Sequence, residues 1–306
     1  MDQVLTNQDL ISVIIVNYNT KDLTINCIQS VYDQTKSVDF EIIVVDNAST
    51  DSSVAAIKER YPNVILLESP TNLGFGRANN LASQIAKGRF LLFLNSDTLL
   101  LNDALKIFYD AYHSYGDKIG CMGTILCNKD YKPIHSFGSF PTFGSVLLGY
   151  IKGRYLKIKE QEPTINNLRF PLTVDYITGA DLYISASLFK RIGQFDESFF
   201  MYFEETDLQK RVSEQGLNNI VIKDAQIIHF AGGSFKKRTH PSNNGTMMIE
   251  KSMFYYLKKN NASLTNYILF RFGYLLIRLP HLFSPRYTFK DQLSYLKFLI
   301  RIDNKI

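Results

Sequence analysis

The sequence has 306 residues, of which 45% are hydrophobic, so it can form one large domain or a domain with an appendage. Its three cysteines form neither an even disulfide framework nor a metal-spaced cluster, which excludes a disulfide-rich secreted class and predicts reduced thiols in a cytosolic protein. The first ten residues contain two aspartates and no long apolar run, which is not the pattern of a signal peptide.

The net charge of +5 is unevenly distributed along the chain. Residues 1–230 hold 21 basic and 26 acidic side chains, whereas residues 231–306 hold 13 basic and 3 acidic ones. Such a basic C-terminal arm indicates an anionic partner, either a membrane or a nucleic acid. No nucleic-acid-reading motif accompanies the arm, so no nucleic acid is expected.

The first half of the chain alternates strand-like and helix-like segments. Strands are expected at residues 11–16, 41–45, 64–67 and 89–94, and the continuous β-branched run at 11–16 is typical of a strand buried on both faces. Helical segments follow the first three strands, and Thr20 is the expected cap of the first helix. This alternation predicts right-handed crossovers and a mostly parallel sheet.

Polar residues follow three of these strands. They are Asn17 and Asn19, Asp46 and Asn47, and Asn95 and Asp97. Ligands of open α/β sheets bind beyond the carboxyl ends of the strands, so this edge of the sheet is the expected site. Each group alone is also compatible with an ordinary strand-to-helix turn, although a buried carboxylate such as that of Asp97 requires a partner.

The second half of the chain is less regular. Strands are expected at 119–126 and 174–184, with loops and hairpins at 128–172 between them. One or two further strands are expected at 220–230, and the chain from about residue 246 is expected to be helical.

Two groups in this half can carry chemistry. Glu204, Glu205 and Asp207 precede or begin an expected helix, and His229 lies at the end of an expected strand. The acidic group is also compatible with a solvated first helical turn, and a lone histidine with a satisfied core residue. Taken in order along the chain, these groups and the polar strand ends indicate a catalytic site more strongly than any one of them does alone.

Seven short motifs, taken in order, carry a resemblance to a known family. They are SVIIVNYN at 12–19, VVDNASTD at 44–51, NLGFGRANN at 72–80, LNSDT at 94–98, TGAD at 178–181, FDESFFMYFEETDL at 195–208 and HFAGGS at 229–234. With this set the chain resembles the family-two inverting glycosyltransferases of the GT-A fold, and within them the bacterial rhamnosyltransferase-like branch. Each motif is loose, but the ordered set over about residues 11–235 is highly specific.

The resemblance implies an α/β fold of GT-A type, with a Rossmann-like, mostly parallel sheet flanked by helices. It implies a catalytic domain at 1–245, with a nucleotide-sugar half at about 1–127 and an acceptor half at about 128–245. A basic, amphipathic helical arm at 246–306 would follow this domain.

The resemblance also implies a divalent metal, Mn²⁺ or Mg²⁺, to neutralise the leaving nucleoside diphosphate. Asp97 resembles the last acidic residue of the family's DxD-type metal motif, although Asn95 stands where a strict motif has its first Asp. His229 resembles the second metal ligand, and an imidazole favours Mn²⁺ over Mg²⁺.

The donor-binding residues follow from the same resemblance. Asp46 resembles the residue that hydrogen-bonds a pyrimidine base, and the first strand-end turn and the segment 77–80 would line the nucleotide pocket. The predicted donor-binding set is Asn17, Tyr18, Asn19, Asp46, Asn47, Arg77, Asn80, Asn95 and Ser96.

Inversion requires a general base on the acceptor side, and the family uses the second member of an acidic pair. That position is Glu205, where Asp is usual, and the extra methylene shifts the carboxylate by about an ångström. Glu204 is the reserve candidate, and Asp207 would orient the site or cap the helix.

The apolar, aromatic segment 264–283 is interrupted by Arg271, Arg278 and Pro280, so it is not expected to span a membrane. It is typical of a helix lying in a membrane interface, with basic neighbours that favour anionic lipid. Its expected apolar side consists of Tyr267, Phe270, Tyr274, Leu275 and Phe283. The alternatives are packing on the catalytic domain and a homodimer interface.

The resulting hypothesis is inverting transfer of one sugar from a nucleotide diphosphate sugar, dTDP-rhamnose or a UDP-hexose, to a saccharide acceptor. The acceptor can be lipid-linked, and the reaction would serve cell-surface polysaccharide synthesis at the cytoplasmic face of the plasma membrane. A processive synthase is disfavoured because the chain has no Trp and no clear span, and a nucleotidyltransferase because no Gly-rich basic loop follows the first strand. A catalytically inactive, membrane-associated nucleotide-sugar-binding protein remains the alternative.

Overall fold

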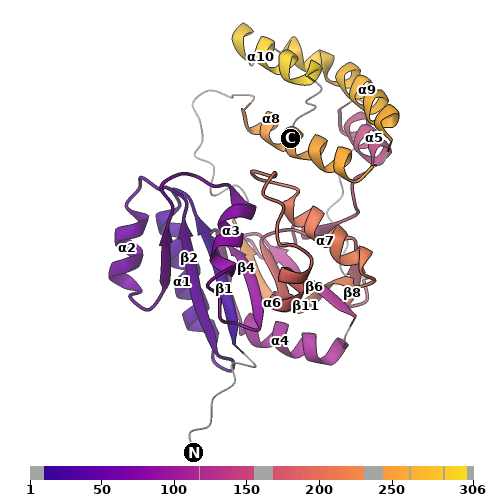
Figure 1. Cartoon of the computed structure of the whole chain (residues 1–306). Coiled ribbons are helices and arrows are strands. Elements are labelled where there is room, and N and C mark those ends of the chain that lie inside the picture. The colour runs from indigo at the N-terminus through magenta and orange to yellow at the C-terminus, as the bar shows by residue number, and fades with distance from the viewer. Residues whose placement is uncertain are drawn as a thin grey trace, which may run out of the picture. The chain divides into compact units, whose positions relative to one another are not determined.

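The computed structural model describes residues 10–116, 118–154, 168–230, 244–261, 263–284 and 287–301. These residues form two compact units (Figure 1). The first unit consists of the described residues up to 139 together with 168–197 and 204–230. The second consists of 140–154, 198–203 and the described residues from 244 onward.

The first unit is built on a mixed sheet with the strand order β3-β2-β1-β4-β10-β6-β11-β5, and β8 pairs with β11. Its strands are β1 (Ile11–Asn17), β2 (Phe40–Asp46), β3 (Ile65–Glu68), β4 (Phe90–Asn95), β5 (Thr98–Leu100), β6 (Ile119–Cys127), β8 (Leu172–Val174), β10 (Asp181–Ser185) and β11 (Asn218–His229). A separate two-stranded ribbon pairs β7 (Phe137–Gly138) with β9 (Tyr176–Ile177).

The four strands at the N-terminal side of the sheet are parallel, as expected from the alternating pattern. The connecting helices are α1 (Lys21–Gln34), α2 (Ser53–Arg60) and α3 (Phe75–Ser83). Beyond β4 the sheet becomes mixed, because β10 runs antiparallel to both β4 and β6, while β6 and β11 are parallel to each other. The remaining helices of this unit are α4 (Ala104–Tyr115), α6 (Ala186–Arg191) and α7 (Glu204–Glu214).

Apolar side chains cover both faces of this sheet. Ile11, Val13 and Ile15 of β1 belong to one buried cluster, and Ile14 belongs to the other. Successive residues of a strand point to opposite faces, so a strand between two helical layers must be apolar throughout. This explains the apolar segments in the sequence and confirms the expected α/β class.

The second unit is helical. It contains α5 (Phe143–Arg154), α8 (Asn244–Lys259), α9 (Leu264–Leu282) and α10 (Phe289–Ile300), which share one aromatic core. The helical C-terminal region is therefore confirmed. Helix α5 lies inside a region expected to be loops, and its three glycines, Gly144, Gly149 and Gly153, explain the error, since glycine lowers intrinsic helix propensity.

The prediction that the aromatic residues of α9 form its outward apolar side is wrong for three of them. Tyr267, Phe270 and Tyr274 are only 4%, 2% and 0% exposed, because they pack in the core of the second unit. Among the described residues, no helix is both long enough and apolar enough to cross a bilayer.

Candidate active site

The carboxyl ends of β1, β2 and β4 meet at one edge of the sheet. In the register of the parallel strands, Asn17 lies beside Asp46, and Val16 lies beside Asn95. The chain runs from β1 outward to β2 and β3, then returns to β4 on the other side of β1. Such a reversal of strand order opens a crevice at the carboxyl edge, where α/β proteins bind ligands.

Asn17 is the centre of a hydrogen-bonded turn at this edge. Its buried amide donates to the Asp46 carboxylate at 2.6 Å and to Ser49 Oγ at 3.0 Å. Its carbonyl oxygen accepts from the hydroxyls of Thr20 at 2.8 Å and Thr24 at 2.7 Å. Thr20 also lies 3.1 Å from the Ser96 hydroxyl, so the ends of β1, β2 and β4 are tied into one network.

Asp46 has both carboxylate oxygens engaged in this network. Oδ1 accepts from Asn17, and Oδ2 accepts the backbone N–H of Ser49 at 2.9 Å. The side chain therefore holds the turn after β2. Its predicted contact with a nucleotide base remains a prediction.

The residues next to Asn17 differ in how they are held. Asn19 has a φ of 54°, in the left-handed region, and its carboxamide oxygen accepts the Thr50 N–H at 2.8 Å. Tyr18 is 47% exposed. A rigid turn thus presents one exposed aromatic ring at the crevice, suited to stacking on a planar base.

Asn47 fixes the loop that leads into α3. Its amide donates to the Gly74 carbonyl at 3.0 Å, and its carbonyl oxygen accepts the Leu73 N–H at 2.8 Å. Gly74 has a φ of 82° and a ψ of −174°, a backbone conformation open only to glycine. This accounts for the Asn-Leu-Gly sequence at 72–74.

Arg77 and Asn80 on α3 contact the segment 195–197. The Asn80 carboxamide forms two hydrogen bonds with the backbone of Phe195, at 2.9 and 3.0 Å. Arg77 Nε donates to Glu197 Oε2 at 2.9 Å. Both side chains were predicted to bind the donor, and the structure shows that they also attach α3 to the segment preceding the acidic motif.

Asp97 and His229 are brought together by strand pairing. Thr98 of β5 lies opposite His229 of β11, and the Phe230 N–H donates to the Asp97 carbonyl at 2.9 Å. The Asp97 Oδ1 and His229 Nε2 atoms are 3.2 Å apart. Asn95 Nδ2 lies 3.4 Å from the same imidazole nitrogen, so the three predicted residues converge on one point.

This pair has the donor atoms that a Mn²⁺ or Mg²⁺ ion requires. The Asp97 side chain is 6% exposed and that of His229 is 17% exposed, so both are largely buried but neither is fully closed off from solvent. Within the described parts of the chain, no group of three or more His, Cys, Asp or Glu side chains is positioned to hold a metal. Two protein ligands are sufficient where substrate phosphates and water complete the coordination. The last four residues of the His229 motif, 231–234, lie outside the described residues.

Asp181 is a buried carboxyl to which the sequence assigns no role beyond its place in the TGAD motif. It is 0% exposed, and its Oδ2 accepts the Thr124 N–H at 2.6 Å. Burial raises the pKa of Asp181 to about 7. It stands at the start of β10, opposite Leu94 of β4, and therefore next to the strand that ends in the metal motif.

The two candidate bases have different environments. Glu204 is 4% exposed, and its Oε2 has no hydrogen-bond partner among the described residues. Burial and the neighbouring charge of Glu205 raise its pKa well above the usual range. Glu205 is only half-buried, and its Cβ and Cγ lie 3.5 Å from where a side chain on Gly179 would begin. Glu205 therefore lies directly beside Gly179 of the TGAD motif.

The backbone before this pair is strained. Tyr202 and Phe203 have φ values of 70° and 69°, so two consecutive non-glycine residues lie in the left-handed region. Such conformations are unfavourable by about 1–3 kcal/mol each and persist where the surrounding structure enforces them, often at functional sites. The surrounding structure therefore fixes the backbone immediately before Glu204, the first residue of α7.

Asp207 forms a buried ion pair that holds local structure. Its fully buried carboxylate accepts from Arg211 Nε at 2.9 Å. The Arg211 guanidinium in turn donates to the backbone carbonyls of Ile192 and Gln194. Asp207 therefore orients Arg211, which holds the turn after α6.

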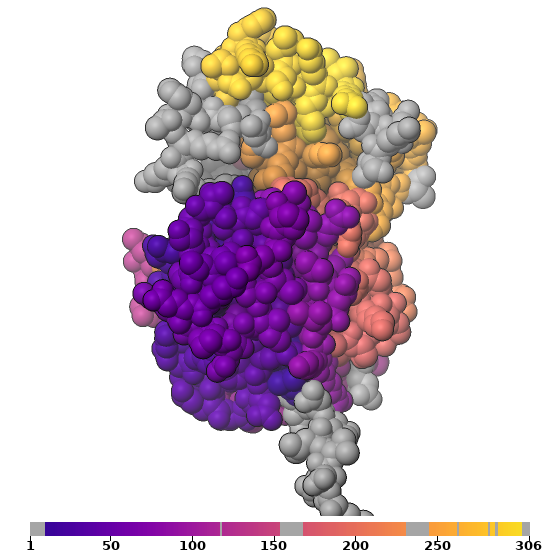
Figure 2. Space-filling model, turned by 60° about the vertical axis from the view of Figure 1, so that its left-hand side comes forward, coloured from indigo at the N-terminus to yellow at the C-terminus, as the bar shows by residue number. Residues whose placement is uncertain are grey.

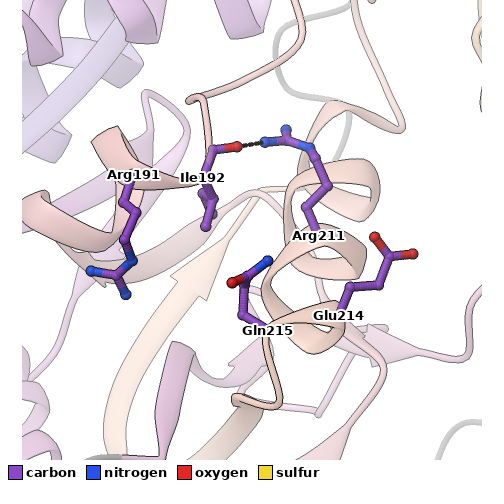
Figure 3. Close-up of a pocket in the computed structure, with 5 residues that line it drawn as sticks. All are labelled: Arg191, Ile192, Arg211, Glu214 and Gln215. Carbon is purple, nitrogen blue, oxygen red and sulfur yellow. Dashed lines mark hydrogen bonds between the residues drawn. The ribbon is translucent and has the colours of Figure 1, made fainter.

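A cavity of about 230 Å³ lies beside the C-terminal half of α7 (Figure 3). It is lined by Arg191, Ile192, Arg211, Glu214 and Gln215. None of the predicted site residues lines it. Glu205 and Glu214 are nine residues apart on one helix, about 13 Å along its axis, so this cavity is separate from the predicted base Glu205.

The chain is similar in sequence to known rhamnosyltransferases. The chain is 25% identical over 202 residues to N-acetylglucosaminyl-diphospho-decaprenol L-rhamnosyltransferase of Mycobacterium tuberculosis, covering 61% of this chain and 66% of the relative. It is 25% identical over 203 residues to rhamnosyltransferase WbbL of Escherichia coli K12, covering 63% of this chain and 73% of the relative. The chain thus spans just under two thirds of the mycobacterial enzyme that it matches.

The fold is shared with solved structures. A mannosyltransferase from Pyrobaculum calidifontis, solved in complex with GDP-Man and Mn²⁺, superposes with a TM-score of 0.55 at 16% identity, covering 95% of this chain and 73% of that one. At this identity the likeness establishes the fold. The family model for glycosyl transferase family 2 matches residues 12–186, which is more than half of the sequence. The chain therefore belongs to glycosyl transferase family 2.

Proposed function

We propose that this protein transfers a single sugar, with inversion at the anomeric carbon, from a nucleotide diphosphate sugar to a saccharide acceptor. The observation that carries the proposal is the Asp97–His229 pair, 3.2 Å apart, beside the turn that joins Asn17 to Asp46. The proposal is supported because groups that can bind a metal and the turn after the first strand lie at the carboxyl edge of one sheet, where α/β proteins bind ligands. The relatives' names support dTDP-rhamnose as donor, and a UDP-hexose is the other candidate.

Asp97 and His229 would hold the divalent ion, with Asn95 beside the imidazole. When bound, Mn²⁺ or Mg²⁺ would act as a Lewis acid that neutralises charge developing on the diphosphate. The Ser96 hydroxyl, already linked to Thr20, lies in the same network and would help to fix the position of Asp97. Tyr18 would stack on the base, and the Asn17–Asp46 turn would set the depth of the nucleotide pocket.

Glu205 would act as general base. Its carboxylate takes the proton of the acceptor hydroxyl while that oxygen forms a bond to the anomeric carbon. The bond from the anomeric carbon to the diphosphate oxygen breaks, and its electron pair leaves with the nucleoside diphosphate. A single displacement of this kind inverts the configuration. Glu204 is less suited to the role, because its side chain is buried, whereas that of Glu205 is half-buried and accessible to an acceptor.

The acceptor would be a saccharide of a cell-surface polysaccharide under assembly. The mycobacterial relative's name specifies a sugar linked through diphosphate to decaprenol. A lipid-linked acceptor of that chemical class would require the enzyme to work at the cytoplasmic face of the membrane, as a peripheral protein. An inactive nucleotide-sugar-binding protein would share the donor pocket and differ in releasing no nucleoside diphosphate.

Removal of the metal is expected to abolish turnover. Incubation with EDTA should stop nucleoside diphosphate release from a panel of dTDP- and UDP-sugars, and added Mn²⁺ or Mg²⁺ should restore it. Asp97→Asn should lower the rate by roughly 10²-fold or more, since a bound ion supplies several kcal/mol of transition-state stabilisation.

The matched control is Asp110→Asn, which changes an exposed carboxylate on α4 of the same unit and should leave the rate unchanged. Full activity in EDTA, or an Asp97→Asn enzyme as fast as the parent protein, would contradict the proposed metal site. Donor binding without any product release under all conditions would favour the inactive binding protein.

A further inference from the structure

Helix α9 is apolar around most of its circumference. One side, which includes Tyr267, Phe270 and Tyr274, packs in the core of the second unit. Its two arginines are also on this side and are each 7% exposed. Arg271 donates to the Leu299 carbonyl, and Arg278 pairs with Glu250. Both charges that interrupt the helix are thus used inside the unit.

The opposite side of α9 is exposed and uncharged. We call this side, with the residue that follows the helix, the outer face; it consists of Ile268, Leu269, Phe272, Leu276, Leu279 and Phe283, with exposures of 44%, 63%, 61%, 49%, 37% and 81%. At about 100° per residue these positions fall within an arc of about 100°, opposite the buried side. An amphipathic surface helix normally has a polar outer face, and a contiguous apolar one marks a binding surface.

Helix α10 carries a second exposed stripe in which apolar and basic residues lie side by side. Phe289, Leu293 and Ile300 are 79%, 40% and 59% exposed. They fall within an arc of about 40° on the helix, and the exposed Lys290, Lys297 and Arg301 fall in the adjoining arc of about 40°. Figure 2 shows α10, at the yellow end of the colour scale, contributing to the surface seen in that view.

The charge of the second unit selects among possible partners. Its described residues include ten Lys or Arg and two acidic residues, Glu250 and Asp291. Glu250 is 1% exposed, and Asp291 is used in the capping box of α10. The surface is therefore almost purely basic. Two copies brought together through this surface would repel each other, whereas an anionic lipid surface is complementary to it.

We propose that the outer face of α9 and the apolar and basic stripe of α10 bind a bilayer surface rich in anionic phospholipid. The apolar side chains enter the boundary between head groups and acyl chains, and Lys290, Lys297 and Arg301 contact the phosphate layer. This inference defines the surface behind the peripheral attachment proposed above. It does not depend on the transfer chemistry, because vesicle binding is measured without donor or acceptor.

The test is flotation of the full chain with vesicles of phosphatidylcholine alone and of phosphatidylcholine with about a third phosphatidylglycerol. Binding is expected only to the anionic vesicles and should weaken as salt rises. The Lys290→Gln, Lys297→Gln variant should partition roughly 30-fold more weakly, from about 1 kcal/mol for each basic residue near the surface. The Phe272→Ser, Leu276→Ser variant should lose binding by at least a similar factor.

Two controls separate this surface from general effects. Arg60→Gln, Lys223→Gln removes two exposed charges from the first unit and should retain vesicle binding. The Tm of the Phe272→Ser, Leu276→Ser variant should match that of the parent chain, since a large fall would show that the outer face packs within the protein. Equal binding to neutral vesicles, or no vesicle binding together with a dimer that this variant dissociates, would overturn the proposal. Nucleoside diphosphate release in free solution should be the same in the parent chain and in the three double variants. A failure of vesicle binding is therefore distinguishable from a failure of the enzyme.

Discussion

Replacement of Glu205 by Gln is expected to reduce the rate of sugar transfer by roughly 10²-fold or more while leaving donor binding intact, the usual effect of removing a positioned general base. The amide keeps the size and shape of the carboxylate, but it cannot accept the proton of the acceptor hydroxyl. Single-turnover measurement of transfer, with donor affinity from equilibrium binding, separates the two effects.

Glu204→Gln is the matched comparison, because it makes the same chemical change one residue away. Burial and the charge of Glu205 raise the pKa of Glu204, so the folded protein holds this proton more tightly than the unfolded chain does. The free energy of unfolding should therefore fall as the pH rises from about 4.5 toward the raised pKa, and Glu204→Gln should remove that fall. If Glu204→Gln were inactive and Glu205→Gln active, the base would be Glu204.

The parallel half of the sheet could be predicted because its signals are local and strong. Ile11 to Val16 form a continuous apolar run, and only a strand covered on both faces requires such a run. The polar residues that end these strands, Asn17, Asp46 and Asn95, could likewise be placed at one edge from chain order alone. The proximity of Asp97 and His229 could be predicted only from the family resemblance, because no local pattern in the sequence indicates that β5 pairs with β11.

Side-chain partners could not be predicted, because they come from distant parts of the chain. Thr20 has the sequence context of a helix cap, yet its hydroxyl bonds Asn17 and Ser96 rather than the helix backbone. The contact of Asn80 with the nucleotide remains a prediction, and the two hydrogen bonds between its carboxamide and the backbone of Phe195 had no signal in the sequence. A polar residue near a predicted site can serve the site directly or hold the segment that does, and composition does not distinguish the two.

The arm shows the same limit for apolar residues. The pattern of α9 indicates hydrophobic surface on more than one side, but which side is covered depends on α5, α8 and α10. The large aromatic residues Tyr267, Phe270 and Tyr274 were assigned outward and lie inward. The arginines were taken as interruptions that argue against a membrane-spanning helix, whereas Arg278 pairs with Glu250 of α8 and Arg271 donates to the Leu299 carbonyl of α10.

Arg278→Met is expected to lower the free energy of unfolding of the second unit by about 3–5 kcal/mol near neutral pH, the typical effect of removing one partner of a buried ion pair. Arg278 Nη2 lies 2.9 Å from Glu250 Oε1, and the two side chains are 9% and 1% exposed. The Tyr274 and Tyr295 hydroxyls also donate to this carboxylate, each at 2.8 Å. Two neutral donors cannot replace the lost cation, so the charge of Glu250 would be left buried. Urea unfolding followed by hydrogen exchange of the α8–α10 amides measures this unit separately.

The pH dependence and a double variant test the physical cause. Burial already raises the pKa of Glu250 and Arg278 lowers it, so Arg278→Met should raise it further. The loss in free energy of unfolding caused by Arg278→Met should then shrink as the pH falls and Glu250 becomes protonated.

Glu250→Gln combined with Arg278→Met should recover most of that loss, because a neutral amide can still accept from both tyrosines and needs no counter-charge. Arg301→Met, on the exposed side of the same helical unit, should have little effect on stability. Equal losses in the single and double variants would instead show that Arg278 stabilises the unit through its guanidinium group, which lies over the rings of Tyr150 and Tyr295.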